Sequence, residues 1–295
     1  MKQRIITAVV IAAGMIAVLV LSGTPVFPVV MSLFAAVAVY EVLKVFGLDK
    51  KYFISVPSYI IAGVMPCLAY VLDYYEVGLY GLPHSIVFLL IMAATAYVFL
   101  LYLFFVLIFE RGKMEFGKAA SALVIVVYVV GSFSAISLMR VIDGIGLYCL
   151  GLVLVSAWIT DCGAYLTGYF FGKHKLIPEV SPKKTVEGAI GGVISSVLVM
   201  LLYGFVTGLV TSGIDAISTT VAPNYLVLGI SGALLSAVAQ GGDLIASVIK
   251  REHGIKDYGS IFPGHGGVMD RFDSIIAVSM ITLIICLIFP PFYVV

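Results

Sequence analysis

The sequence predicts an all-α, polytopic integral membrane protein with about nine transmembrane helices. Of its 295 residues, 62% are hydrophobic and only 11% are charged, with a mean hydropathy of +1.16. Soluble domains are about 45–50% apolar and about 25% charged, and one of this size could not bury so much apolar surface. Lipid is therefore the expected solvent. The net charge of +1 provides no broad basic field, which argues against nucleic acid as a partner.

Nine apolar runs are long enough to cross a bilayer, which takes about 20 residues. Glycine and proline turn signals separate them, as at residues 23–25 and 81–83. The first run follows Lys2 and Arg4 and has the alternative of a signal peptide, although no small-residue cleavage site ends it. The predicted spans are residues 4–22, 25–46, 52–72, 84–109, 116–139, 145–171, 187–211, 223–249 and 272–294.

Basic residues fall almost entirely on one side of these nine spans. Sixteen of the 17 lysines and arginines lie in the N-terminal segment or in the loops that follow even-numbered spans, and only Arg140 lies on the other side. The positive-inside rule then places the N-terminus and these loops in the cytoplasm and the C-terminus outside. We therefore expect a multi-pass protein of the cell (inner or plasma) membrane, with its polar loops facing the cytoplasm.

One polar stretch, residues 243–273, stands out from this apolar background. Carboxylates flank both of its ends, cations lie between them, and five glycines with Pro263 make the middle flexible. Such a stretch suits the binding of a metal-bound polyphosphate. An ordinary charged loop between two membrane helices is the alternative.

Several carboxylates lie within or at the ends of the predicted spans, where ionisable groups are costly and usually face a protein interior or a wet cavity. Asp161 is in the sixth span and Asp243 in the eighth. Asp270 and Asp273 are three residues apart at the start of the ninth, so they share a face if that turn is helical. These all-oxygen ligands would suit Mg²⁺. Buried carboxylates that serve helix packing are the alternative.

Glycine and alanine residues accompany these acids. Asp161 shares a helical face with Tyr165, Gly168 and Gly172, which predicts that this face meets another helix. The pair Gly241-Gly242 precedes Asp243 and either loosens the helix or lets a neighbour approach.

Glu41, in the second span, is predicted to serve local packing. Lys44 follows it by three residues and the cytoplasmic edge is near, so a local ion pair is the favoured interpretation.

The loop between the sixth and seventh spans is basic. Ser181-Pro182 predicts a turn, Lys183 and Lys184 are adjacent, and Thr185 is placed to cap the seventh helix. A helix N-terminus flanked by lysines suits a phosphate group. The ordinary basic flank of a membrane helix is the alternative.

Taken in order, these residues resemble a known family. Its signature is matched by Ser247-x-x-Lys250-Arg251, Lys256-Asp257, Pro263-x-His265-Gly266-Gly267 and Asp270-Arg271-x-Asp273. The family is that of phosphatidate cytidylyltransferase, or CDP-diacylglycerol synthase. SPKKTxEG at residues 181–188 and DxxAYxxGxxFG at residues 161–172 resemble its secondary motifs. The motifs cover about the last 130 residues, whereas residues 1–150 agree only in being a run of membrane helices.

The resemblance implies a membrane-bound nucleotidyltransferase of phospholipid synthesis. It would transfer the cytidylyl group of CTP to phosphatidic acid, giving CDP-diacylglycerol and pyrophosphate, with Mg²⁺ as cofactor and the number of cations open. Because the attacking phosphate is already an anion, positioning and charge neutralisation would dominate. The implied partners are CTP, phosphatidic acid and the bilayer, and the small-residue rows would also allow a homodimer.

We assign roles accordingly, with residues 1–140 as a helical scaffold that includes any dimer contacts and 141–295 as the catalytic region containing the signature loop 247–273. The catalytic set is Asp243, Asp270, Lys250, Arg251 and Lys184. The substrate-binding set is Lys183, Lys184, Lys256, His265, Gly266, Gly267, Arg271 and Ser247. The metal set is Asp243, Asp270, Asp273 and Asp161.

Part of the substrate-binding assignment concerns backbone groups. The loop at His265, Gly266 and Gly267 is expected to close over the triphosphate partly through its N–H groups. For the His265 side chain, a phosphate donor and a loop strut are equal alternatives.

Two other functions remain as alternatives. A CTP-dependent lipid-alcohol kinase would use similar reactants but transfer the γ-phosphoryl group. An ion-coupled transporter would use Asp161 and Asp243 as cation sites, and it would predict broken helices and repeat symmetry.

Overall fold

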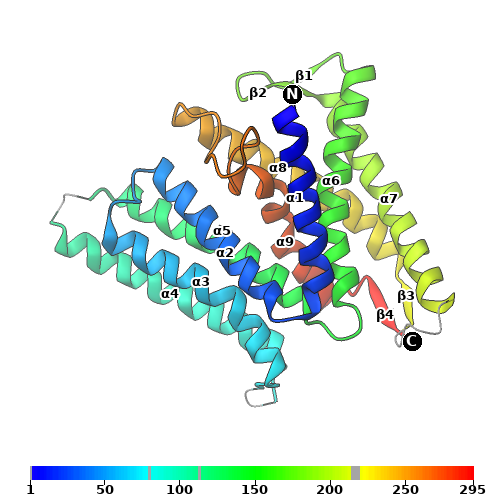
Figure 1. Ribbon diagram of the computed structural model, residues 1–295, viewed down its shortest axis with the longest axis horizontal. Coiled ribbons are helices and arrows are strands. Elements are labelled where there is room, and N and C mark those ends of the chain that lie inside the picture. The colour runs from blue at the N-terminus through cyan, green and yellow to red at the C-terminus, as the bar shows by residue number, and fades with distance from the viewer. Residues whose placement is uncertain (1, 79–80, 112–113, 214–219) are drawn as a thin grey trace. The chain divides into compact units, whose positions relative to one another are not determined.

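Long α-helices make up most of the computed structural model, which describes residues 2–78, 81–111, 114–213 and 220–295. In these ranges nine α-helices of 19 to 28 residues follow one another along the chain (Figure 1). They are α1 (Lys2–Val20), α2 (Val26–Val45), α3 (Tyr52–Tyr74), α4 (His84–Phe109), α5 (Phe116–Arg140), α6 (Gly146–Phe171), α7 (Val186–Gly213), α8 (Tyr225–Glu252) and α9 (Met269–Ile288). A 3-10 helix, η1 (Leu21–Gly23), follows α1.

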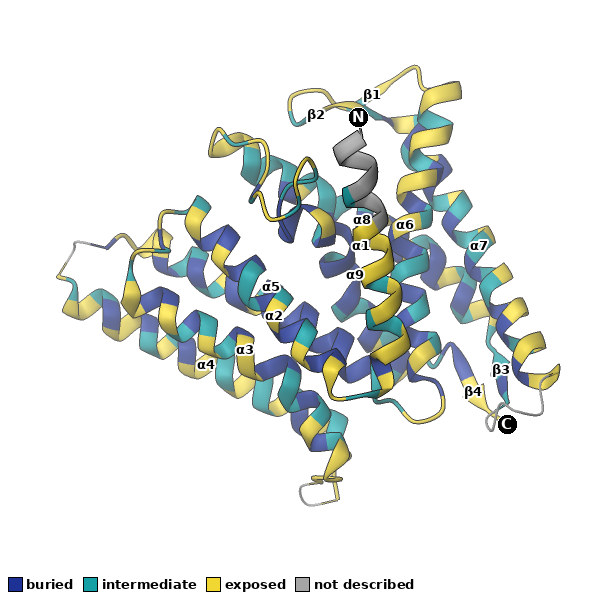
Figure 2. Cartoon of the chain, viewed as in Figure 1, coloured by how far each residue is buried: buried dark blue, intermediate teal, exposed yellow. Residues whose placement is uncertain are grey.

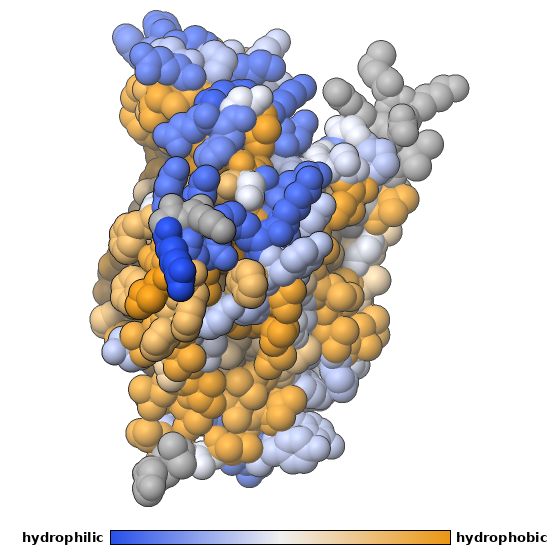
Figure 3. Space-filling model, turned by 90° about the vertical axis from the view of Figure 1, so that its left-hand side faces the viewer, coloured by the Kyte–Doolittle hydropathy of each residue, from blue (hydrophilic) through white to orange (hydrophobic). Residues whose placement is uncertain are grey.

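Eight of the described helices, α2 to α9, are long and apolar enough to cross a membrane. Twenty helical residues span about 30 Å, the thickness of the hydrocarbon layer. Many large apolar side chains are exposed, including Phe109 at 79% and Leu226 at 74%. Hydrophobic residues cover a broad area of the face in Figure 3. The all-α, multi-pass membrane class is therefore confirmed, while the first predicted span corresponds to α1, which is outside this set of eight.

The chain forms two compact units. Unit 1 comprises residues 1–141 and 255–271. In it α2 packs against α3 and α5, and α4 packs against the same two helices. Helix α5 is buried along most of its length (Figure 2), with small residues such as Ala122 and Ser134 at its contacts. Small residues allow such close helix packing in lipid.

Unit 2 comprises residues 142–254 and 272–295, and in it α6 packs along α7 while α8 packs against both. Glycines allow these helices to approach one another closely. A Cβ atom on Gly163 would lie 2.6 Å from Cβ of Ser195, and one on Gly232 would lie 2.8 Å from Cα of Val197. The small-residue rows therefore serve contacts within the chain, and the homodimer stays a prediction.

Two short antiparallel strand pairs in unit 2 were not expected from the sequence. Strand β1 (Lys175–Ile177) pairs with β2 (Ser181–Thr185), and β3 (Val221–Pro223) pairs with β4 (Phe292–Val294). The turn predicted at Ser181-Pro182 is wrong, because both residues belong to β2 and the turn occupies residues 178–180.

The ninth helix is displaced toward the N-terminus from its predicted range of 272–294. It begins at Met269, whose N–H has no partner within the helix and donates a hydrogen bond to the side-chain carboxylate of Glu41. It ends at Ile288, because Pro290 and Pro291 cannot continue a helix. The residues after them return as β4.

The two units divide the chain between residues 141 and 142, and residues 255–271 of the signature loop group with unit 1. The assignment of function to the two parts stays a prediction. Lys113, one of the basic residues used for the orientation, lies outside the described residues.

Candidate active site

An ion pair between β2 and α8 lies at the centre of the candidate site. Nζ of Lys184 is 2.6 Å from Oδ2 of Asp243, and the two side chains are 27% and 29% exposed. Partial burial strengthens such a pair relative to one in open water. The structure thus joins the basic loop to the acidic eighth helix, two features that the sequence placed 59 residues apart.

Two more aspartates lie within electrostatic range of this pair. Asp161, on α6, interacts electrostatically with both Asp243 and Lys184. Asp273, on α9, interacts with Asp243, Asp161 and Lys250, and its Oδ1 accepts a hydrogen bond of 2.8 Å from the N–H of Ser274. We call Asp161, Asp243, Asp273, Lys184 and Lys250 the carboxylate cluster. It gathers three of the four predicted metal ligands and two of the predicted cations from four different elements.

The cluster depends on a close approach of α8 and α9. A Cβ atom on Gly242 would overlap Cβ of Ala277 and lie 3.1 Å from the carbonyl oxygen of Asp273. By contrast, a Cβ atom on Gly241 would have nothing within 4 Å. Of the two alternatives for this glycine pair, Gly242 admits a neighbouring helix, and α8 is continuous through it.

Hydrogen bonds from two side chains join α6, α7 and α8 next to the cluster. Oγ1 of Thr160 donates to Oγ of Ser236 at 2.8 Å, and Nε2 of Gln240 donates to the carbonyl oxygen of Ala189 at 3.2 Å. Thr160 and Ser236 are fully buried. Thr160 is adjacent to Asp161, and Gln240 and Ser236 lie one and two turns before Asp243 on α8. These bonds therefore fix the register of α6, α7 and α8 beside the cluster.

The start of α7 positions Lys184. Oγ1 of Thr185 accepts a hydrogen bond of 3.1 Å from the N–H of Gly188, so Thr185 caps the helix as predicted. A Cβ atom on Gly168 would lie 2.9 Å from the same oxygen, so α6 approaches this cap closely, as its glycine row predicted. Tyr165, expected on that contacting face, is instead 71% exposed.

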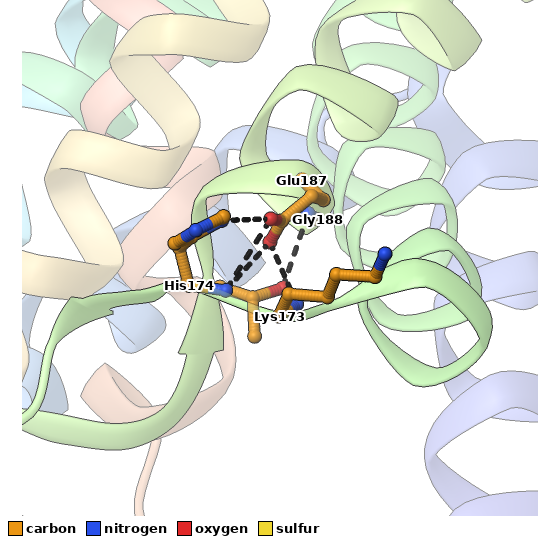
Figure 4. A network of polar contacts seen from close by, with 5 residues as sticks. Lys173, His174, Glu187 and Gly188 are labelled. Atoms are coloured by element: carbon orange, nitrogen blue, oxygen red, sulfur yellow. Dashed lines mark hydrogen bonds and ion pairs between the residues drawn. The ribbon is translucent and has the colours of Figure 1, made fainter.

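A second set of contacts holds the β1–β2 hairpin at the same helix start. Nδ1 of His174 lies 2.6 Å from Oε1 of Glu187, and Oε2 accepts hydrogen bonds from the N–H groups of Lys173 and His174 at 3.1 and 3.2 Å (Figure 4). The His174 side chain is 78% exposed, as expected, yet it has this partner. Glu187 is therefore engaged by the hairpin that carries Lys183 and Lys184.

The donor chemistry of the cluster fits Mg²⁺. Its ligands are carboxylate oxygens, which hard cations prefer. Among the described residues no three His, Cys, Asp or Glu side chains already stand close enough together to hold a metal ion. Mg²⁺ is usually bound by one or two carboxylates together with water and substrate phosphates, so Asp243 with Asp273 or Asp161 would be enough protein ligands, and their role as metal ligands stays a prediction.

The remaining predicted ligand, Asp270, belongs to the contacts of the signature loop in unit 1. It is 9% exposed, and its Oδ2 accepts hydrogen bonds from the N–H groups of Tyr258 and Gly267 at 2.7 and 3.0 Å. Asp270 therefore anchors the loop, and its role as a metal ligand stays a prediction.

The loop carries other predicted substrate-binding residues. The N–H of His265 donates to the carbonyl oxygen of Phe262 at 2.8 Å, and Nε of Arg271 donates to the carbonyl oxygen of His265 at 2.8 Å. Nδ1 of His265 is buried and has no hydrogen-bond partner in the described part of the chain. Two of the three backbone N–H groups expected to bind triphosphate, those of His265 and Gly267, are thus already engaged, and the His265 side chain is a further candidate donor.

Other predicted substrate-binding and catalytic residues are placed without a decisive contact. Lys183, Arg251 and Lys256 are exposed, and Ser247 is half-buried on α8. Sequence reasoning identified these residues by motif only, and their roles stay predictions.

One residue was misjudged from the sequence. Glu41 is 2% exposed, and its carboxylate accepts hydrogen bonds from the N–H groups of Val268 and Met269 at 3.1 and 2.9 Å. The expected local pairing with Lys44 is wrong, since Nζ of Lys44 lies over the ring of Tyr40 instead. A lone carboxylate in an apolar span was the signal, but its partner is more than 220 residues away.

The family model described as "Cytidylyltransferase family" matches residues 2–289 of this sequence. The chain belongs to the cytidylyltransferase family. It is therefore a nucleotidyltransferase, and the match extends over the N-terminal helices as well as the motifs. The transporter alternative is set aside by this membership.

Curated relatives of this cytidylyltransferase agree along almost the whole chain. It is 31% identical over 282 residues to a protein of Bacillus subtilis (strain 168) named phosphatidate cytidylyltransferase, covering 94% of each chain. It is 32% identical to proteins with the same name from Staphylococcus haemolyticus (strain JCSC1435) and Staphylococcus aureus (strain COL). Those alignments cover 93% of this chain and 94% of each relative.

Proposed function

We propose that this cytidylyltransferase transfers the cytidylyl group of CTP to phosphatidic acid, giving CDP-diacylglycerol and pyrophosphate. The names of its relatives support the choice of substrates. The observation that carries the site is the carboxylate cluster, in which Lys184 is bound to Asp243 beside Asp161 and Asp273. Lysines and carboxylates gathered on membrane-spanning helices suit a reaction between a soluble nucleotide and a lipid.

In the proposed reaction a phosphate oxygen of phosphatidic acid attacks the α-phosphorus of CTP. The new P–O bond forms as the bond from the α-phosphorus to the oxygen bridging it to the β-phosphorus breaks, and pyrophosphate leaves with that electron pair. Both reactants are anions, so the enzyme must offset their repulsion. No general base is needed, because the nucleophile carries its charge already.

Lys184 and Lys250 are the proposed counterions within the cluster. A phosphate oxygen could replace the Asp243 carboxylate as the partner of Lys184, since the two share the geometry of an oxyanion beside an ammonium group. Asp243 and Asp273, with Asp161 beside them, are the proposed holders of Mg²⁺, which when bound would neutralise charge on the triphosphate. By sequence, Lys183, Arg251, Lys256, His265 and Arg271 are proposed to bind the phosphates.

The proposed location of the reaction is the cytoplasmic side of the cell membrane. The strong bias of lysine and arginine toward one set of loops supports it. CTP would then enter from the cytoplasm and phosphatidic acid from the bilayer.

Product analysis with purified protein in detergent tests the proposal. Phosphatidic acid and Mg²⁺ are incubated with CTP labelled on the α-phosphate and, in parallel, with CTP labelled on the γ-phosphate. The proposal requires α-label in the lipid phase and γ-label in pyrophosphate. In a further incubation diacylglycerol, a lipid alcohol, replaces phosphatidic acid, and γ-label without α-label in that lipid would establish the kinase alternative. The absence of α-label from lipid when phosphatidic acid is supplied would overturn transfer to phosphatidic acid.

A further inference from the structure

Glu41 is a buried acid that the proposed reaction does not use. It lies on α2, in an apolar membrane helix, with 2% of its surface exposed. Oε1 accepts the N–H of Val268 at 3.1 Å and Oε2 accepts the N–H of Met269 at 2.9 Å. The carboxylate therefore accepts hydrogen bonds from two successive backbone amides where α9 begins. All of these residues belong to unit 1.

Electrostatics explains why a carboxylate is stable there. The first N–H groups of a helix lack intrahelical partners and carry a partial positive charge. Such a site ordinarily attracts a free anion or phosphate. Here Glu41 supplies the anion, while Asp270 accepts the N–H groups of Gly267 and Tyr258. The start of α9 is thus bound by two protein carboxylates.

The signature loop is shaped around the Glu41 side chain. A Cβ atom on either Gly259 or Gly267 would overlap Oε1 of Glu41. Both positions must therefore be glycine if the carboxylate is to reach the amides. The presence of glycine at these two motif positions is thus explained by a side chain of the second helix.

We infer that Glu41 is a positioning residue for the signature loop, holding residues 255–271 in the conformation that binds the triphosphate of CTP. The inference rests on the proposed function for the role of the loop in CTP binding. Glu41 acts through Val268 and Met269 and touches no substrate. Its loss should weaken CTP binding selectively, since phosphatidic acid is expected to enter from the bilayer.

The central test is Glu41→Gln, which keeps the size of the side chain but replaces one acceptor oxygen by an NH₂ donor facing an N–H donor. The loss of one charge-assisted hydrogen bond should raise KM for CTP by about ten-fold or more. KM for phosphatidic acid should stay within about two-fold. Glu115→Gln is the matched control, because Glu115 is exposed at the start of α5 in the same unit and makes no side-chain cap.

A second variant approaches the same contact from the loop. Gly259→Ala places a methyl group where the carboxylate of Glu41 lies, so it should reproduce the rise in KM for CTP. If both changes act on one contact, the double variant will be no worse than about two-fold beyond the worse single variant. Should Glu41→Gln fail to fold, Gly259→Ala alone decides the question by the same kinetic criterion.

A readout independent of activity completes the test. Lys256 lies exposed within the loop, and trypsin cleavage after it, followed by mass spectrometry, should be faster in Glu41→Gln than in wild type or Glu115→Gln. A lower kcat with unchanged KM for CTP would overturn the inference in favour of a purely structural role, and so would unchanged cleavage. If wild type transfers no label, the proposed function fails, and the cleavage rates still decide whether Glu41 holds the loop.

Discussion

Replacing Gly242 by alanine should disturb the carboxylate cluster without altering any charged group. The new Cβ would overlap Cβ of Ala277, which is attached directly to the backbone and cannot rotate away, so α8 and α9 must separate. Overpacking of this kind typically costs about 1–3 kcal/mol, and alanine returns about 1 kcal/mol through its better helix propensity. A net loss of up to roughly 2 kcal/mol relative to wild type follows, and a difference of about 1–3 kcal/mol from an alanine substitution that gains the same propensity without the overlap. Because Asp243 is the next residue, its distance from Asp273 should increase.

Gly241→Ala is the matched control, since a Cβ there meets nothing within 4 Å. It should leave activity unchanged and raise stability by up to about 1 kcal/mol. Thermal unfolding in detergent and label transfer from CTP would be measured for both variants. Gly242→Ala should melt several degrees lower, at about 2–4 °C per kcal/mol for a domain of this size, and transfer more slowly. Equal melting temperatures and activities in the two variants would refute the close packing of α8 on α9.

Three further predictions concern the residues around the cluster. Lys184→Met should reduce kcat/KM for label transfer by about 10²-fold or more. Lys183→Met, which removes an exposed lysine, should reduce kcat/KM less. Equal losses in the two variants would contradict a special role for the lysine that pairs with Asp243. Thr185→Val should lower stability in thermal unfolding by about 1 kcal/mol, because the N–H of Gly188 loses its acceptor, whereas Thr185→Ser should retain the cap. Chelation with EDTA should abolish transfer and added Mg²⁺ should restore it, an expectation that activity in metal-free buffer would disprove.

The sequence was a good guide wherever a local pattern determines structure. Apolar runs bounded by glycine and proline located α2 to α8 to within a few residues. The cap at Thr185 and the close approach at Gly168 also followed from spacing along one helix. These features depend on helical geometry and on the cost of exposing backbone to lipid, both of which act over short distances.

Contacts between residues far apart in the sequence were harder to predict. That Asp161, Asp243 and Asp273 belong together was predicted from their chemistry, but the choice of Lys184 over its neighbour Lys183 as the partner of Asp243 required the β2 strand. Glu41 is the clearest example of a pairing that the sequence did not predict. Lys44 was the expected local partner, but the carboxylate instead accepts hydrogen bonds from two amides near the C-terminal end of the chain. Fixed N–H donors at a helix start stabilise a buried carboxylate more than a mobile lysine side chain does. Strand β4 was missed because its apolar residues continue the pattern of the ninth span.

The most direct test of the account is label transfer by Asp243→Asn beside wild type, with the melting temperature of each protein in detergent. The substitution keeps the shape of the side chain but removes the charge that pairs with Lys184. We expect α-label from CTP to enter lipid with wild type and to fall by about 10²-fold or more with the variant, at a melting temperature that shows a folded protein. Transfer at the wild-type rate by a folded Asp243→Asn protein would contradict the claim that this cluster carries the reaction.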